Sequence, residues 1–214
     1  MFELIDNEIE EYCEAHTSPE SEMMHRLYRE TNLKVMNPRM LSGHLQGAFL
    51  AFISRMLRPR NILEIGTYTG YSALCLAEGL VTDGRLDTIE IDEELEDMIL
   101  KYFQQSPLQN KINLIIGDAL KIIPTLDVSY DLVFIDAEKQ DYLSYYQMIL
   151  PKVRKGGIIL VDNVLWNEKV VREVKEKDKD TKAIMNFNDF VQKDPAVKNM
   201  MLPFRDGILL IEKL

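Results

Sequence analysis

The chain has 214 residues, is 46% hydrophobic and carries a formal net charge of -10 at pH 7. These values suit one domain with a sizeable core, and the acidic balance disfavours nonspecific binding to nucleic acid. No apolar stretch is long enough to span a membrane, and no basic-then-apolar leader occurs. The only two cysteines, Cys13 and Cys75, lie far apart in the sequence without a C-x-x-C partner and do not indicate a disulfide framework. We therefore expect a cytoplasmic protein that forms one domain over residues 1–214.

Two amphipathic helices are expected in an N-terminal helical region over residues 1–35. The first has its apolar face at Phe2, Ile5, Ile9, Tyr12 and Cys13. The second is expected to begin after Ser18 and Pro19, with Met23, Met24, Leu27 and Tyr28 on its apolar face. Either face could pack on the rest of the chain or on another copy of it, and the sequence leaves both open.

The remaining residues, 36–214, alternate between helical and strand patterns and predict an α/β body. Helices are expected at residues 43–57, 71–80 and 142–150, and strands at 61–65, 86–91, 112–116, 131–136, 157–162, 201–204 and 207–211. Such an order predicts an open, mostly parallel sheet whose C-terminal strand is antiparallel. Ligands of such sheets bind at the carboxyl ends of the strands.

A glycine turn follows the first strand, at residues 66–70. Its G-x-x-x-G spacing lacks the third glycine of a dinucleotide fingerprint, and Glu64 would repel a pyrophosphate but could receive the cationic part of S-adenosylmethionine. Glu90 lies a little more than 20 residues past this turn, where an acidic residue can bind ribose hydroxyls, and Asp118 could meet the adenine amine. The alternatives are tight packing for the glycine turn and a helix N-cap for Asp118.

A second polar cluster is expected where the fourth and fifth strands end, at Asp136, Asp162 and Asn163. If these strands are neighbours, two carboxylates and an amide oxygen converge, which suits Mg²⁺, with Ca²⁺ or Mn²⁺ as alternatives. Open coordination positions could then take two adjacent substrate oxygens, such as those of a catechol. The alternative is that the same residues only close a turn and cap a loop.

Four ordered segments resemble the cation-dependent O-methyltransferases of the catechol and caffeoyl-coenzyme A type, including bacterial members. They are residues 63–72 (LEIGTYTGYS), Ile89-Glu90, residues 134–139 (FIDAEK) and residues 160–166 (LVDNVLW). The resemblance implies a Rossmann-like class I methyltransferase fold with a seven-stranded sheet, N-terminal helices, S-adenosylmethionine as cofactor and a homodimer. Glu138 stands where many bacterial members have aspartate and is given no role, and Gly43-His44 departs from the family near the acceptor entrance.

The same resemblance implies the roles of individual residues. Lys139 would be the catalytic base, and Asp136, Asp162 and Asn163 would bind the metal. The cofactor would be bound by Met40, Glu64, Gly66, Tyr68, Ser72, Glu90, Asp118, Ala119 and Asp136. Leu41 and Trp166 would contact the substrate, although Trp166 could equally be a packing residue. To act as a base, Lys139 needs a lowered pKa, which a nearby dication and partial burial are expected to give.

The expected activity is therefore metal-dependent methyl transfer from S-adenosylmethionine to a hydroxyl of a catechol-like or caffeoyl-type small molecule. One alternative keeps the chemistry and changes the acceptor to a hydroxylated uridine in transfer RNA, against which the acidic balance counts mildly. Another is a noncatalytic nucleoside-binding protein, against which the intact set of Asp136, Lys139, Asp162 and Asn163 counts. A dehydrogenase is disfavoured by the missing third glycine.

Overall fold

The structure of the protein is a computed structural model that describes residues 7–214. Seven strands form one sheet in the order β3-β2-β1-β4-β5-β7-β6. All the strand pairs recorded before β7 are parallel, and β7 is antiparallel to both β5 and β6. The expected mostly parallel sheet with an antiparallel C-terminal strand is confirmed.

The chain divides into two compact units: an N-terminal unit of residues 10–118, and a C-terminal unit of residues 119–214 with residues 7–9. The expectation of a single domain stays a prediction. No helix among the described residues is long and apolar enough to cross a membrane.

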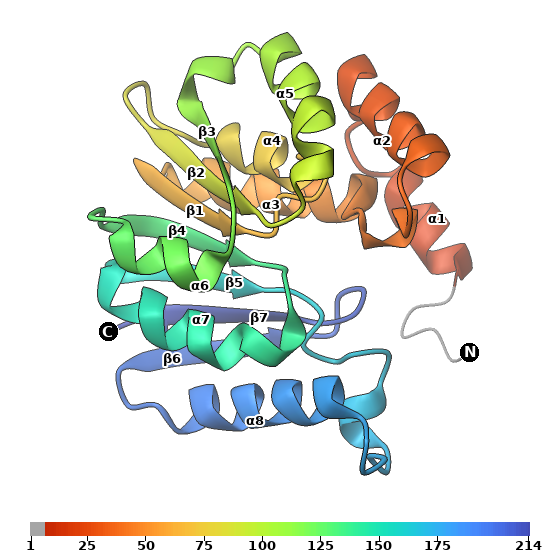
Figure 1. Cartoon of the computed structure of the whole chain (residues 1–214). Coiled ribbons are helices and arrows are strands. Elements are labelled where there is room, and N and C mark those ends of the chain that lie inside the picture. The colour runs from red at the N-terminus through yellow and green to blue at the C-terminus, as the bar shows by residue number, and fades with distance from the viewer. Residues whose placement is uncertain (1–6) are drawn as a thin grey trace. The chain divides into compact units, whose positions relative to one another are not determined.

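The elements up to residue 118 match most of the expected ranges. They are α1 (Asn7–Ala15), α2 (Glu22–Lys34), α3 (Gly43–Leu57), β1 (Asn61–Ile65), α4 (Tyr71–Ala77), β2 (Arg85–Glu90), α5 (Glu96–Gln105) and β3 (Ile112–Ile116). In register, β2 lies between β1 and β3, with Ile65 opposite Ile89 and Glu90 opposite Ile116. Within the N-terminal unit, α2 packs beside α5 (Figure 1).

In this unit one expected helix boundary is confirmed and one is wrong: α2 begins after Pro19, whereas α4 ends before Leu80. Helix α2 begins at Glu22, because the Ser21 side chain accepts a hydrogen bond from Met24 N and caps the helix there. Helix α4 ends at Ala77 and does not reach Leu80. At Gly79 a Cβ would lie 2.1 Å from the backbone of Ser54, so α3 crosses closely there and leaves no room for another helical turn with side chains.

The first expected helix is only partly described. Phe2 and Ile5 lie outside the described residues, while Ile9 and Tyr12 on α1 are 56% and 64% exposed. In α2, Met24 and Leu27 are buried as expected, whereas Tyr28 is 43% exposed. The apolar face of α2 therefore packs inside the N-terminal unit, and the described part of α1 leaves its apolar side chains accessible.

The C-terminal unit contains α6 (Ala119–Ile122), β4 (Tyr130–Ile135), α7 (Tyr142–Ile149), β5 (Val153–Val161), α8 (Lys179–Lys193), β6 (Val197–Leu202) and β7 (Ile208–Lys213). In this unit α8 packs along α7 and β6 (Figure 1). Phe187 of α8 makes edge-to-face contacts with Tyr142 and Tyr146 of α7, at centroid distances of 5.7 and 6.0 Å. The packing of these buried rings holds α8 against α7.

Several elements of this unit differ from the expected ranges. Strand β6 begins at Val197 and ends at Leu202, where residues 201–204 were expected. Helix α8 was not expected, because the mixed charges of residues 172–182 indicated a solvated loop or helix end, although Asp178 caps α8 through Thr181 N. Strand β5 begins at Val153 and not at Gly157. The pairing passes from Tyr130–Val153 to Leu132–Ile158, so extra residues form a bulge in β5, where Gly156 has φ 69°.

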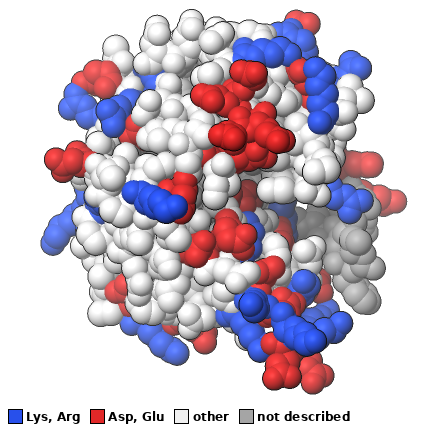
Figure 2. All heavy atoms as spheres, in the orientation of Figure 1, with Lys and Arg blue, Asp and Glu red and all other residues white. Residues whose placement is uncertain are grey.

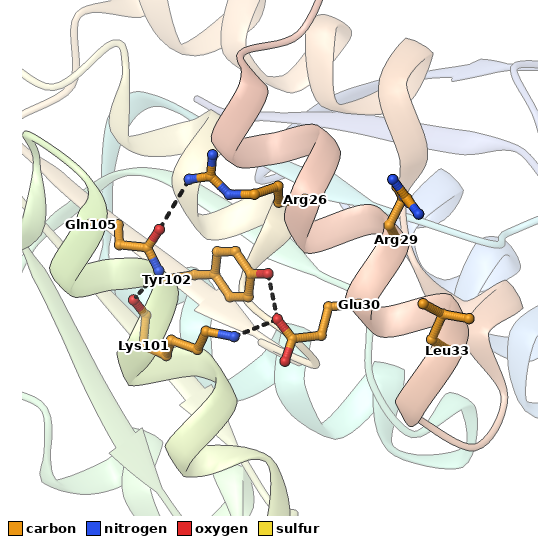
Figure 3. A pocket seen from close by; sticks show the side chains of 7 residues that line it. All are labelled: Arg26, Arg29, Glu30, Leu33, Lys101, Tyr102 and Gln105. Carbon is orange, nitrogen blue, oxygen red and sulfur yellow. Dashed lines mark hydrogen bonds and ion pairs between the residues drawn. The ribbon is translucent and has the colours of Figure 1, made fainter.

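A pocket of about 300 Å³ lies between α2 and α5 and contains none of the expected site residues. It is lined by Arg26, Arg29, Glu30, Leu33, Lys101, Tyr102 and Gln105 (Figure 3). Glu30 accepts hydrogen bonds from Lys101 Nζ and Tyr102 OH, and pairs with Lys34 at 2.8 Å. The bonds to Lys101, Lys34 and Tyr102 lower the pKa of Glu30 to about 2, so Glu30 holds α5 against α2 as a carboxylate.

Glu30→Gln is expected to lower the free energy of unfolding by about 1 kcal/mol at pH 7, because the pair with Lys101 is partly solvated. The folded pKa lies below the ordinary value of 4.5, so this stability is present above pH 4.5 and is lost as the pH falls towards 2. Urea unfolding should show that the difference in unfolding free energy between variant and wild type is smaller at pH 3 than at pH 7. The control is Glu22→Gln on the same helix, where the carboxylate is 90% exposed. A difference that is independent of pH would contradict this role.

Candidate active site

The glycine turn after β1 is held by hydrogen bonds from its own backbone. Gly66 N donates to Ile89 O at 3.0 Å, and Tyr68 N donates to Glu90 Oε2 at 2.6 Å. Gly66 and Gly70 have φ values of 95° and 90°, and a Cβ on Gly70 would lie 2.7 Å from the Phe103 ring. Both glycines are therefore required by the backbone, as their spacing indicated.

Glu90 lies at the end of β2 and is 7% exposed. Its second oxygen, Oε1, accepts a hydrogen bond from Asp92 N at 2.9 Å. Burial raises the pKa of Glu90, and the hydrogen bonds from Asp92 and Tyr68 oppose that rise. Each carboxylate oxygen keeps a further lone pair after accepting one N–H, so the carboxylate can still accept from hydroxyl groups such as those of a ribose.

Glu64 is fully buried and lies against threonines. Thr88, its register partner on β2, donates a hydrogen bond to Glu64 Oε2 at 2.5 Å, and the Thr88 and Thr67 hydroxyl oxygens are also 2.5 Å apart. The sequence predicted a carboxylate directed into a ligand pocket. In the structure Glu64 is linked to the glycine turn through the hydroxyls of Thr88 and Thr67, and its role towards a ligand stays a prediction.

Two residues of the glycine turn, Tyr68 and Thr69, and the first residue of α4, Tyr71, bind the part of the chain that precedes α3. Tyr68 OH donates to the carbonyl oxygens of Met36 and Asn37, at 3.3 and 3.2 Å. The Thr31 and Thr69 hydroxyls share a buried hydrogen bond of 3.0 Å, and Tyr71 OH donates to Glu20 Oε2 at 2.6 Å. The structure therefore brings parts of residues 20–37 to the glycine turn and to the start of α4, and the cofactor roles of Met40 and Tyr68 stay predictions.

The other expected cofactor and substrate residues differ in exposure. Met40 is 60% exposed, whereas Leu41, Ser72 and Ala119 are buried. Asp118 is half-buried and follows Gly117, whose N–H donates to Glu90 O at 2.7 Å. This bond places the chain after β3 beside the end of β2, within the N-terminal unit.

The expected metal ligands lie at two neighbouring strand ends of the C-terminal unit. Asp136 and Asp162 directly follow Ile135 and Val161, which are register partners on β4 and β5. Asp162 N donates to Ile135 O at 3.0 Å, so the two aspartates begin level with each other, at the roughly 5 Å spacing of paired strands. Asn163 N donates to Asp162 Oδ1 at 2.8 Å. The structure thus brings the three residues to one edge of this unit.

Lys139 lies at the same edge. Its Nζ is 2.9 Å from Asp136 Oδ1, and its side chain is 13% exposed. Burial acts to lower the pKa of Lys139, but the Asp136 carboxylate and the Tyr142 hydroxyl outweigh it and hold this pKa above its ordinary value. The expected lowering of the Lys139 pKa depends on a bound dication as well as on burial, and it stays a prediction.

Trp166 lies close to Lys139, in the loop after β5. Lys139 Nζ is 5.8 Å from the Trp166 ring centroid, and Lys169 Nζ is 5.5 Å from it. The indole Nε1 is buried and makes no hydrogen bond within the described part of the chain. A buried donor of this kind needs an acceptor, which a bound ligand could supply.

Two residues of this edge were not assigned by the sequence. Tyr142 OH donates to the backbone oxygen of Asp162 at 3.0 Å and also hydrogen-bonds Lys139. Asp206, in the turn between β6 and β7, accepts hydrogen bonds from Asn167 N and from the Asn163 side chain. The sequence shows Tyr142 only as the start of a predicted helix and Asp206 only between two predicted strands, and the sole sequence signal is their proximity to the motifs.

The donor set at the edge fits a hard divalent cation. It offers two carboxylates and one amide oxygen, and the Lys139 ion pair uses only Oδ1 of Asp136. Among residues 7–214 no group of three or more His, Cys, Asp or Glu side chains is arranged to hold a metal ion. A cation bound by Asp136 and Asp162 would therefore depend on the Asn163 amide and on oxygens from outside the chain.

Comparison with known proteins identifies the class of this fold. A family model described as O-methyltransferase matches residues 14–214. The chain is 32% identical over 214 residues to "Probable caffeoyl-CoA O-methyltransferase 2" of Dictyostelium discoideum, covering 98% of this chain and 93% of that protein.

Two solved structures share the fold, each with a TM-score of 0.89, 27% identity and 97% of this chain covered. They are the SAH-bound methyltransferase PaMTH1 of Podospora anserina, covered over 94%, and the O-methyltransferase TomG of Streptomyces achromogenes, involved in tomaymycin synthesis and in complex with SAM, covered over 96%.

The strand order and these likenesses define a class I methyltransferase fold. The chain belongs to the O-methyltransferase family, because the family model matches almost its whole length. It is accordingly a S-adenosylmethionine-dependent O-methyltransferase, as its sequence motifs indicated.

Proposed function

We propose that the protein transfers the methyl group of S-adenosylmethionine to a hydroxyl of a catechol-like or caffeoyl-type small molecule. The reaction would require a divalent cation, for which Mg²⁺ is the first candidate. The observation that carries this proposal is the level pair Asp136 and Asp162 with Lys139 at 2.9 Å from Asp136. Asp136, Asp162 and Asn163 would hold the cation. The relatives named for caffeoyl-CoA support the acceptor class.

The proposed division of work follows the contacts of each side chain. A bound dication supplies a lowered pKa for a coordinated hydroxyl. With its own pKa lowered by the same dication, Lys139 would be a neutral amine and would receive the proton of that hydroxyl through Nζ. Trp166 would offer a ring face and an indole N–H to the acceptor. Leu41 would contribute a buried apolar contact to the acceptor. On the cofactor side, Glu90 accepts from the ribose hydroxyls. The remaining cofactor contacts are proposed for Met40, Glu64, Gly66, Tyr68, Ser72, Asp118, Ala119 and Asp136.

The charge distribution favours a small acceptor over transfer RNA. The net charge is -10, and acidic and basic side chains are interspersed on the face shown in Figure 2. A polyanionic acceptor gains affinity from a basic surface that releases counterions. We therefore treat transfer RNA as an outcome of the test and not as a second proposal.

The test is methyl transfer from labelled S-adenosylmethionine to caffeic acid, with Mg²⁺ or with a chelator, combined with calorimetry of cofactor binding. Turnover that needs Mg²⁺ supports the proposal. Tight cofactor binding without turnover on catechols contradicts the acceptor class and directs the search to a hydroxylated uridine in transfer RNA. Binding of NAD⁺ in place of S-adenosylmethionine would contradict the cofactor assignment.

We also propose a cytoplasmic homodimer. In its support, Phe52 and Met56 lie one turn apart on α3 and are 61% and 70% exposed, which is a large apolar pair for the surface of a monomer. Cys13 and Cys75 are free thiols, as a reducing compartment allows. Sedimentation at micromolar concentration checks the dimer, and a single monomeric species would contradict it.

Tyr142→Phe is expected to lower kcat about tenfold with little change in KM, because one hydrogen bond that holds Lys139 is worth ~1.4 kcal/mol. The matched control is Tyr146→Phe on the same helix, whose hydroxyl donates to Asp194 at 2.8 Å. Both variants remove a hydroxyl of a buried tyrosine, so their unfolding free energies should fall alike. Steady-state kinetics separate them, and equal kcat values would contradict a role for Tyr142 in holding Lys139.

A further inference from the structure

The turn between β6 and β7 is fixed against the loop that follows β5. Val164 N donates to Gly207 O at 3.2 Å, and Leu165 N donates to Asp206 O at 2.9 Å. Gly207 has φ 88°, and a Cβ there would lie 2.4 Å from Leu165 Cγ, so only glycine permits this approach. The backbone of Asp206 is thus held in a set position next to the residues that follow Asp162.

The Asp206 carboxylate interacts with two asparagines from this position. Its Oδ1 accepts a hydrogen bond from Asn167 N. The side chain of Asn163 also interacts with the carboxylate and opposes the rise in the Asp206 pKa that burial causes. An ionised carboxylate can only accept hydrogen bonds, so the amide of Asn163 must donate through Nδ2. The other end of that amide, Oδ1, is then turned away from Asp206.

An amide binds a cation only through its oxygen, because its nitrogen presents two positively polarised hydrogens. We infer that Asp206 is a positioning residue that fixes the Asn163 amide with Oδ1 available to a divalent cation. This inference rests on the proposed function of Asp136, Asp162 and Asn163. Asp206 does not join the two aspartates as a third acidic ligand, since residues 7–214 contain no such three-membered group. Its effect on a cation passes through Asn163.

Asp206→Asn provides the test, because it exchanges one acceptor for a donor and leaves the size of the side chain unchanged. The oxygen of the introduced amide can keep the bond to Asn167 N, and its nitrogen then faces Asn163. The Asn163 amide is expected to reverse and present Nδ2 to the cation. Mn²⁺ binding, followed by electron paramagnetic resonance of the free ion, should weaken about 10–100-fold, the usual effect of losing a partner behind a metal ligand.

A double variant, Asp206→Asn with Asn163→Asp, should restore Mn²⁺ binding towards the wild-type value. A carboxylate at position 163 accepts from the introduced amide and still offers an oxygen to the cation in either orientation. A residue that acts only on stability would not show this recovery. Failure of the double variant to recover affinity, while its melting temperature matches that of the wild type, would overturn the inference.

Two further variants separate this inference from the proposed function. Asp194→Asn makes the same substitution in the same unit, at a carboxylate that accepts from Tyr146 OH and Ala196 N, and should leave Mn²⁺ binding unchanged. Asp162→Asn should abolish Mn²⁺ binding. If Asp162→Asn abolishes it and Asp206→Asn does not weaken it, the inference about Asp206 is wrong and the metal site stands. If Asp162→Asn leaves Mn²⁺ binding intact, the proposed metal site itself is wrong.

Discussion

Asp162→Asn is expected to reduce kcat/KM for a catechol about a thousandfold, or ~4 kcal/mol of transition-state stabilisation, because it removes one of two carboxylates that we propose to hold the cation. The substitution is nearly isosteric, and its oxygen can still accept from Asn163 N, as Oδ1 does at 2.8 Å. The fold should therefore survive. Steady-state methyl transfer with Mg²⁺ measures the effect.

The control for this variant is Asp194→Asn, which should keep wild-type turnover. Binding of S-adenosylmethionine by calorimetry should stay unchanged in Asp162→Asn, since Asp162 is not among the proposed cofactor residues. Turnover at the wild-type rate with the same dependence on Mg²⁺ would show that Asp162 does not hold the cation.

Lys139→Met is expected to lower kcat about 10²–10³-fold at saturating acceptor, the usual contribution of a positioned proton acceptor. Methionine keeps the length of the apolar stem and its contact with the Tyr142 and Trp166 rings, so the loss would report the amine. The binding of S-adenosylmethionine should be unaffected. Single-turnover transfer measures the chemical step directly.

The chain offers a close control for this lysine. Lys169 also lies over the Trp166 ring, at 5.5 Å, but its side chain is 48% exposed and pairs with Asp178 at 3.6 Å. Lys169→Met should therefore leave kcat within a small factor of wild type. Equal losses in the two lysine variants would assign the effect to the positive field around Trp166 and contradict a base role for Lys139.

The sequence predicts the strands well where local pattern and burial agree. Strands β1 and β3 have the expected bounds, because short apolar runs between turn residues have few other folds available. Strand β5 starts earlier than its pattern indicates, since its first residues belong to a bulge that only the partner strand β4 defines. Helix α8 was missed although Ile184, Phe187 and Val191 are buried at helical spacing, because the charged segment before it hid the start.

The candidate site, too, could be predicted from the sequence only in part. The closeness of Asp136 and Asp162 could be predicted, since both follow strands that a parallel sheet aligns at their carboxyl ends. The contacts of Tyr142 and Asp206 could not, because they come from α7 and from the turn before β7 and depend on tertiary packing. The ion pair between Lys139 and Asp136 could not be predicted for a similar reason, since the sequence shows Asp136 as a metal ligand and does not show its direct pairing with the lysine.

The hydrogen bonds of Tyr68, Thr69 and Tyr71 bear on how the chain can be shortened or fused. Their partners are spread over residues 20–37, so hydrogen bonds hold the glycine turn against the helical segment before it. A shortened chain that starts at α3 would remove the partners of all three side chains at once, although it would keep every residue of the strand and helix that flank the turn. Tags and fusion partners are therefore best joined ahead of Glu20.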